Sequence, residues 1–365
     1  MSLEKLHLKS IKDPFPSSLP IRRRISTSSR WLRTVSRVLM AASPLEWGLG
    51  VDHLVHSSSL PKLVESTSAV ISRKGCRPMR IKLFRSLPFF ALLTATTGCS
   101  YYYESKADDM VQRQMDAMVF VKGGEFMMGN PGGWDGSKDS WPPHKVKLDD
   151  FHIQKYEVTQ GDFEIFQAVT GYEHSYRFYE KNRDEQPERY EPELPAVASW
   201  TDASAFCEWL GKQSGQPVHL PTEAQWEYAA RARGQMLKYA TKNGKAEASV
   251  TMAAGPDQHA LGVREHHSKL PLKPGSFPPN PIGLYDMSGN VAEWVYDNYE
   301  EDYYANSPVY NPQGPTEPVI SDWTNDPYRV LRGGSFKDFI GNTTVTRRSD
   351  IQNGSDDTSG FRCAY

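Results

Sequence analysis

The sequence predicts an α+β domain of low regular secondary structure over residues 117–365. Three observations predict it: short alternating apolar runs before residue 159, three helical patterns between residues 159 and 230 of which two have capped starts, and frequent Pro and Gly beyond them. A composition with 38% hydrophobic and 12% aromatic residues is enough for a buried core. No internal repeat and no second domain are visible, so these residues are expected to share one compact unit.

The first expected elements are strands. In MVFVKGGEFMMGN, Val119, Val121 and Phe126 alternate with other residues around Gly123-Gly124, which is a hairpin signal. A loop rich in Gly, Trp and Pro then leads to a second expected strand pair in HKVKLDDFHIQKYEVT.

Three helices follow, two of them with a start signal. Thr159 is a candidate N-cap for the first, and Gly171 ends it. A charged loop, 179–192, leads to the second helix in SWTDASAFCEWLGKQSG, which has one apolar face. Thr222 with Gln225 three residues later forms a capping box that starts the third. The remainder of the chain is expected to be mostly loop.

Residues 1–78 differ in composition from the rest. They hold 13 Lys or Arg against 5 Asp or Glu, a net charge of +8, so the remainder carries −10 of the total of −2. A nucleic-acid or targeting arm is one explanation. We favour a spurious or unstructured upstream extension, because Met79 begins what reads as an export signal, and we expect no nucleic-acid partner.

The export signal spans residues 79–99. Basic residues after Met79 precede an apolar run, Leu87 to Ala95, and small residues follow it up to Cys99. Gly98-Cys99 resembles the end of a lipoprotein box, which predicts a lipid on Cys99, and Ser100 behind it predicts sorting to the outer membrane. Cleavage as an ordinary signal peptide is the alternative. The expected location is periplasmic in either case, and membrane contact comes only through the lipid.

Two further expectations concern the mature chain. Residues 100–116 are polar and Tyr-led, which is typical of a tether. Of the four cysteines, Cys76 and Cys99 precede the domain, and Cys207 and Cys363 lie within it. Export permits a disulfide between these last two.

The domain resembles the formylglycine-generating enzymes, the sulfatase-modifying factor family. The resemblance rests on stretches in the family's order: FVKGGEFMMG, YEVTQGDFEIF, LPAVASWTDASAFCEWL, LPTEAQWEYAARA, NPIGLYDMSGNVAEW, RVLRGGSF and GFRCAY. It implies the formylglycine-generating-enzyme fold, which has a C-type-lectin-like core.

The resemblance also implies two structural sites. Cys207 and Cys363 correspond to a structural disulfide of the family. The segment SGNVAEW resembles a calcium site, where Gly289 and Val291 would offer carbonyls and Asn290 and Glu293 side-chain oxygens, the donors that calcium prefers. A tight turn with a capped Asn is the alternative. The tryptophans and Arg362 are interpreted as core and buried ion-pair residues.

The cysteine pair that binds copper in the catalytic members is missing. By position its first member falls on Asp338 and its second near Thr343, and no cysteine lies between Cys207 and Cys363. Soft thiolates select Cu(I), so a copper site is not expected. Histidines are scattered, and the single His-His pair, His266-His267, is expected on an exposed loop.

The sequence looks most like exported family members that lack the cysteine pair, among them a periplasmic protein of pyoverdine maturation. Their GGS loop borders a cleft, which here would present Asp338, Arg347 and Arg348 with Trp294 behind. We therefore expect a binding protein for an envelope protein or small ligand rather than an enzyme. A periplasmic tailoring enzyme for a small metabolite or peptide is the alternative, and a sulfatase-modifying oxidoreductase is a remote one.

Overall fold

The computed structural model describes residues 89–246, 270–322, 325–352 and 357–365, with side chains given from residue 103 to 350 and from 357. The chain divides into Met1–Arg77 and Pro78–Tyr365, and every described residue belongs to the second unit. The expectations for residues 1–78, for the start of the export signal and for His266-His267 lie outside the described residues. The elements in chain order are α3 (Phe89–Asp116), β1 (Met118–Val121), β2 (Gly124–Met128), β3 (His144–Leu148), β4 (Phe151–Gln154), α4 (Gln160–Thr170), α5 (Tyr179–Glu185), η1 (Pro187–Tyr190), α6 (Trp200–Ser214), α7 (Glu223–Ala230), β5 (Ala292–Asn298), η2 (Tyr303–Ala305), β6 (Tyr328–Arg332), η3 (Ile340–Asn342), β7 (Arg348–Gln352) and β8 (Ser359–Phe361).

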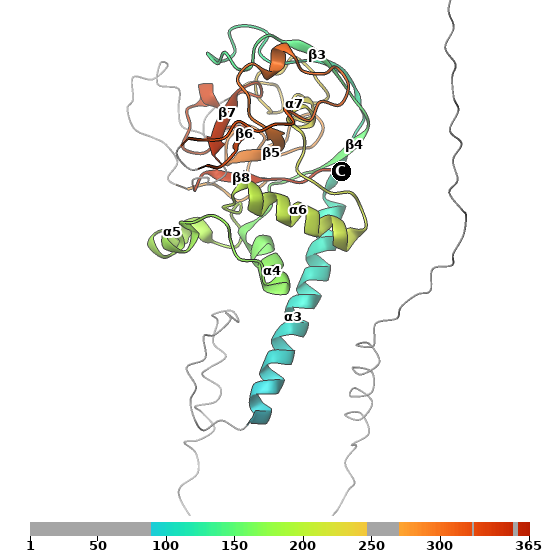
Figure 1. The fold of residues 1–365 in the computed structure, drawn as a ribbon. Coiled ribbons are helices and arrows are strands. Elements are labelled where there is room, and N and C mark those ends of the chain that lie inside the picture. The colour runs from blue at the N-terminus through green and yellow to red at the C-terminus, as the bar shows by residue number, and fades with distance from the viewer. Residues whose placement is uncertain (1–88, 247–269, 323–324, 353–356) are drawn as a thin grey trace, which may run out of the picture. The chain divides into compact units, whose positions relative to one another are not determined.

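A four-stranded sheet with the order β7-β6-β5-β8 divides the core in two (Figure 1). β5 is antiparallel to β6 and parallel to β8. Because side chains alternate along a strand, Trp294 and Leu331 face a cluster with α4 and α6, whereas Val295 and Val330 face one with α7, β2 and β3. Both faces are therefore covered, as the α+β prediction requires.

This sheet was not expected from the sequence, which indicated mostly loop after the third helix. Its strands are three to seven residues long. The first four residues of β5 are all buried, so the strand shows no apolar–polar alternation. Periodicity alone cannot identify such short, doubly covered strands.

The two expected hairpins are wrong in their pairing. β1 pairs with β4 and β2 with β3, so the chain forms one long antiparallel ribbon with a bend instead of two successive hairpins. Gly123 and Gly124 do not adopt the positive φ that a tight hairpin turn needs. The bend is held by Asp150, which pairs with Lys122 at 2.8 Å and accepts from Gly123 N at 2.9 Å.

The bend predicts a requirement for glycine at position 123. A Cβ there would lie 2.3 Å from Leu148 O and 2.4 Å from the Asp149 carbonyl carbon, and backbone atoms cannot move aside cheaply. We expect Gly123→Ala to lower the free energy of unfolding by about 1–3 kcal/mol in urea titrations. Gly136→Ala is the matched control, because a Cβ there meets nothing within 4 Å. Equal stabilities for the two variants would contradict the close approach.

The three helices form as expected. Thr159 Oγ accepts from Asp162 N, and Gly171 ends α4 with a φ of 71°. Ser199 and Thr222 each complete a capping box at the starts of α6 and α7. Residues 179–192, expected as a loop, instead contain α5 and η1.

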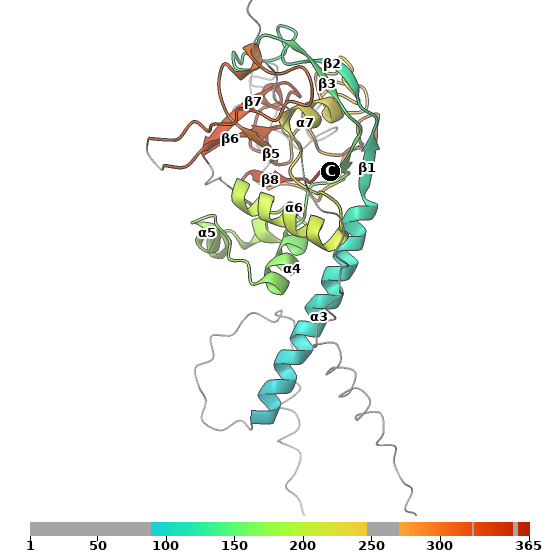
Figure 2. The same ribbon diagram turned by 45° about the vertical axis from the view of Figure 1, so that its right-hand side comes forward.

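The tether expected for residues 100–116 is instead part of a helix that packs on the domain. α3 runs along α4 and α6 and leads directly into β1 (Figures 1 and 2). Met110 is fully buried in the α4–α6 cluster, and Arg113 pairs with Asp162 at 2.9 Å. Apolar residues at helical spacing thus anchor the segment. Among the described helices, none is long and apolar enough to cross a membrane.

The predicted disulfide is present. Cys207 of α6 and Cys363, two residues beyond β8, are bonded with their Cα atoms 5.6 Å apart. The bond closes a sequence separation of 156 residues and joins α6 to the end of the chain.

Candidate functional site: the GGS turn and the charge ladder beneath it

The GGS turn leaves the end of β6 through two glycines with positive φ, Gly333 at 87° and Gly334 at 67°. Ser335 then donates both its backbone N–H and its hydroxyl to one oxygen of Asp338, at 2.8 and 2.7 Å. Phe336 N also donates to Asn290 O at 2.8 Å. The turn is therefore preformed, and Asp338 is its internal hydrogen-bond acceptor.

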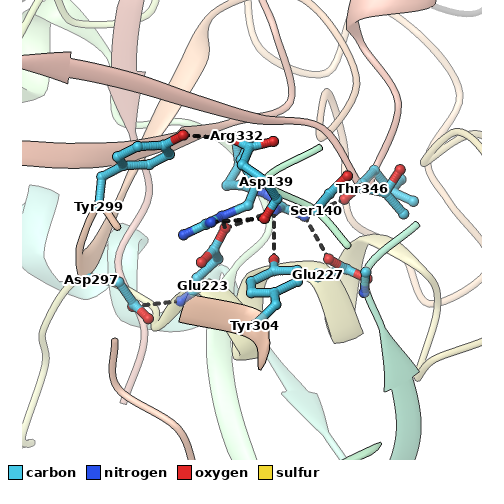
Figure 3. Close-up of polar contacts among 12 residues, drawn as sticks. Asp139, Ser140, Glu223, Glu227, Asp297, Tyr299, Tyr304, Arg332 and Thr346 are labelled. Carbon is cyan, nitrogen blue, oxygen red and sulfur yellow. Dashed lines mark hydrogen bonds and ion pairs between the residues drawn. The ribbon is translucent and has the colours of Figure 1, made fainter. Parts of the chain in front are cut away.

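Beneath the turn lies a buried ladder of alternating charges (Figure 3). The register of β6 and β7 places Arg332 and Arg348 directly opposite each other. Glu223 of α7 separates their charges, because its Oε1 accepts from both at 2.8 Å. Glu227, one helical turn later, accepts from Arg332 at 2.7 Å and from Arg231 at 2.9 Å. These five side chains are 98–100% buried, so they form a structural network under the turn.

The ladder also sets protonation states. Burial alone would raise the pKa of Glu223, but the charges of Arg348 and Arg332 hold it below its ordinary value. The pKa of each of these two arginines is raised in turn by Glu223, against the effect of burial. Tyr304 accepts from Arg332 at 3.2 Å, and Arg348 lies over its ring. Glu223, Arg332 and Arg348 therefore stay charged across the physiological pH range.

The four residues expected to line a cleft do not converge. Trp294 is fully buried in the α4–α6 cluster and donates to Ala198 O at 2.8 Å. Arg348 is 2% exposed and belongs to the ladder. Asp338 and Arg347 remain half-exposed near the turn. Only these two are available to a ligand, and Arg347 makes no side-chain bond within the described residues.

Hydrogen bonds to Asp135 hold the segment that follows the GGS turn. Asp135 accepts from the Thr344 hydroxyl at 3.2 Å and from the Thr346 hydroxyl at 2.5 Å. Its other oxygen accepts from Asn130 Nδ2 and Ser137 N. The Gly/Trp/Pro-rich loop and the segment after the GGS turn are thereby fixed to each other.

Asp297 borders the ladder and is protonated at neutral pH. It is 2% exposed, and burial together with the charge of Glu223 raises its pKa to about 8, although Glu223 N donates to it at 2.7 Å. Between its ordinary pKa near 4 and this value, the folded state binds one more proton than the unfolded state. Asp297 therefore stabilises the fold at low pH, and this stabilisation is lost as the pH rises to about 8.

The raised pKa of Asp297 predicts that the free energies of unfolding of the protein and of its Asp297→Asn variant differ by an amount that depends on pH. The amide is neutral at every pH, so the variant should gain stability relative to the parent from pH 4 to 8, by up to about 1.4 kcal/mol per pH unit. Urea titrations of both proteins across that range measure the difference. Asp302→Asn, at an exposed position, is the control. A constant difference between parent and Asp297→Asn would refute the raised pKa.

Comparison with known proteins places this geometry in a family. The model of the sulfatase-modifying factor enzyme 1-like domain matches residues 104–365. The chain belongs to the sulfatase-modifying factor family. The formylglycine-generating enzyme of Streptomyces coelicolor is 32% identical over 302 residues, which cover 69% of this chain and 90% of that enzyme.

Two further matches show how varied the relatives are. The serine/threonine-protein kinase pkn1 of Chlamydia pneumoniae is 32% identical over 296 residues, covering 76% of this chain but only 43% of that kinase. This chain thus spans less than half the length of that relative. The structure of PvdO from Pseudomonas aeruginosa superposes with a TM-score of 0.50 and 25% identity, covering 68% of this chain and 93% of that one.

The family's copper-binding pair has no counterpart in the domain's chemistry. The family resemblance predicts that its first member falls on Asp338 and its second near Thr343. Asp338 accepts from the turn, and Thr343 is buried and donates to Ile340 O at 2.9 Å. The domain's own cysteines, Cys207 and Cys363, are bonded to each other. No thiolate remains in residues 104–365 to hold Cu(I).

Glu293 does not fit the calcium site that the family resemblance implies. Arg362 binds both its carboxylate oxygens, at 2.7 and 2.6 Å, and Trp226 donates to one of them at 2.8 Å. The ion pair is fully buried, which confirms the role expected for Arg362. A cation ligated by Glu293 would lie against the guanidinium, so this carboxylate is not a calcium ligand in the observed arrangement.

The other three implied ligands lie at a tight turn. Asn290 has a φ of 65°, accepts from Leu272 N at 2.8 Å and donates to Glu157 at 2.6 Å. Gly289 donates to Gly333 O and thereby ties this turn to the GGS turn. The carbonyl ligands Gly289 and Val291 stay a prediction.

Sequence reasoning missed the ladder, although a signal was present. Glu223, Glu227 and Arg231 recur every four residues, on the same helix as the buried Trp226. Charges at this spacing beside a buried tryptophan indicate buried partners elsewhere in the chain. Their partners on β6 and β7 could not be named because those strands were not predicted.

Proposed function

We propose that this chain is an exported binding protein that uses the sulfatase-modifying factor fold without its copper chemistry. The observation that supports this most directly is the use of cysteine. The two thiols of the domain are consumed by the disulfide that joins α6 to the C-terminal segment, and by family resemblance the positions of the redox pair fall on Asp338 and near Thr343. Oxygen activation at a bis-thiolate copper site therefore has no ligands here.

The first test asks whether this chain lacks the reaction of the formylglycine-generating enzymes. Purified full-length protein, loaded with copper, is incubated with a Cys-containing sulfatase peptide, and mass spectrometry follows conversion of the cysteine. We expect no conversion under conditions where the Streptomyces coelicolor enzyme converts the peptide. A Cys76→Ala/Cys99→Ala variant excludes copper bound by the two cysteines outside the domain. Turnover by either form of this chain would overturn the proposal.

The surface proposed for binding is the one beside the GGS turn. Asp338 and Arg347 are half-exposed there on a turn that needs no rearrangement, and a preformed site lowers the entropic cost of association. One acid and one base can orient a polar ligand or a peptide through paired charges.

A copurification experiment tests this surface. Tagged protein is recovered from its own cell envelope as the parent, as Arg347→Glu, and as Arg177→Glu, an exposed arginine of another loop. We expect a stoichiometric protein or ligand to accompany the parent and the Arg177→Glu control but not Arg347→Glu. Equal recovery with all three would place binding elsewhere.

Export and lipid attachment are part of the same proposal. They are supported by the basic, apolar and small-residue segments of 79–99 and by Gly98-Cys99. Mass spectrometry of the mature N-terminus should find acylated Cys99. An unmodified start upstream of Met79 would refute export through this signal.

A periplasmic tailoring enzyme is the second candidate, favoured by the similarity to the PvdO structure. Asp338 would then act as an acid or base. Asp338→Asn should abolish consumption of a metabolite that accumulates when the gene is deleted, whereas a binding protein would show no such metabolite.

A further inference from the structure

A half-buried arginine–tryptophan stack lies at the opposite end of β6 from the GGS turn. Arg329 is near the start of β6, and its guanidinium carbon is 3.6 Å from the centroid of the Trp200 ring. Trp200 is the first residue of α6 and is fixed by donating to Val295 O at 2.8 Å. The rigid indole therefore holds the guanidinium in one plane.

The guanidinium has few polar partners. Within the described residues it makes no ion pair, and its single hydrogen bond, to Tyr296 O, is long at 3.4 Å. Its Nε is buried without a hydrogen-bond partner. Partial burial lowers the pKa of Arg329, and the nearby Tyr296 and Asp297 act in the opposite direction without offsetting it. An unpaired, partly desolvated guanidinium gains more from an added carboxylate than a hydrated one does.

Apolar side chains stand on the same face. Ile320 lies opposite Pro327 in an antiparallel bridge, so it shares a face with Pro327 and, by alternation, with Arg329. Ile320 and Tyr296 are each 44% exposed. Trp200, Tyr296, Ile320 and Arg329, here called the Arg329 patch, thus combine aromatic, aliphatic and cationic groups. Trp, Tyr and Arg are the residues that dominate binding energy in protein interfaces.

We propose that the Arg329 patch docks an acidic segment of a partner protein. An Asp or Glu of that segment pairs with Arg329, and a neighbouring apolar side chain packs on Tyr296 and Ile320. Charge complementarity with an acidic segment rests on Arg329 itself, because its guanidinium has one long hydrogen bond and a buried Nε without a partner among the described residues. The patch is separate from the surface at the GGS turn, so it goes beyond the binding role proposed above.

Site-directed photo-crosslinking tests the proposal on the full chain in the cells that encode it. A benzoylphenylalanine replaces Ile320, and the same reagent at Val309, exposed to 52% elsewhere on the domain, is the control. We expect one discrete adduct from position 320 only, and mass spectrometry should locate the cross-link in a segment containing Asp or Glu.

The effect of charge on the yield of the adduct distinguishes specific docking at this patch from non-specific hydrophobic binding. Adding Arg329→Glu should reduce the adduct about tenfold or more, whereas Arg347→Glu at the GGS turn should leave it unchanged. Thermal unfolding of the purified Arg329→Glu protein confirms that it remains folded, and Arg329→Gln, which keeps a planar group over Trp200, serves if it does not. The proposal is overturned by an adduct that survives both Arg329 variants, by one that links two copies of this chain, or by the absence of an adduct above the Val309 control.

Discussion

Replacing Arg332 by methionine is expected to lower the free energy of unfolding by about 3–5 kcal/mol, because the change leaves buried carboxylates short of positive charge. Arg332 is fully buried and pairs with Glu223 at 2.8 Å and Glu227 at 2.7 Å. It also donates to Val345 O, so one side chain joins β6, α7 and the segment after the GGS turn. Urea unfolding at pH 7 measures the loss.

A control separates this effect from the loss of any arginine. Arg177→Met removes an exposed guanidinium and should change stability by less than about 0.5 kcal/mol. Removing Glu227 as well, in Glu227→Gln/Arg332→Met, should cost less than the sum of the two single changes, since the second change relieves an uncompensated charge. Strict additivity would show that the ladder does not act as a network.

The second large effect is expected at the disulfide. In the chain-entropy model, a bond closing 156 residues stabilises the folded state by about 5 kcal/mol. Cys207→Ala/Cys363→Ala should therefore unfold at a much lower urea concentration than the parent, in the absence of reductant. Both sulfurs are fully buried among the residues of the α4–α6 cluster, which adds a small packing loss.

The matched control uses the remaining cysteines. Cys76→Ala/Cys99→Ala lies outside the domain and should leave domain unfolding unchanged. Alkylation of the unfolded but unreduced parent protein should leave Cys207 and Cys363 unlabelled, whereas labelling of either would show that the bond does not form.

The local elements of this fold were accessible from the sequence because their signals are short-range. Thr159 and Thr222 cap helices through bonds to residues three positions away, and such bonds depend on no other part of the chain. The disulfide was accessible for another reason: family resemblance identified its two positions before any geometry was known.

The pairing of strands was not accessible. MVFVKGGEFMMGN has the alternation and the glycines of a hairpin, yet β1 pairs with β4 and β2 with β3. Strand pairing is decided by which apolar faces meet in the core, and that information lies outside the segment. The same limit hid the sheet β7-β6-β5-β8, whose short strands are covered on both faces.

The findings on the candidate site can be separated in the same way, into those that the sequence supplied and those that required the tertiary structure. The sequence by itself showed that Cys207 and Cys363 are the two cysteines of the domain, and it led us to expect no copper pair, with Asp338 at the first of that pair's positions by family resemblance. Only the tertiary structure decided that Arg348 belongs to the core, that Glu293 is held by Arg362, and that Arg329 lies on Trp200 with no ion pair among the described residues. The physical reason is that the role of a charged side chain depends on the residues that pack against it from other strands and helices. The local amino-acid sequence does not specify those residues.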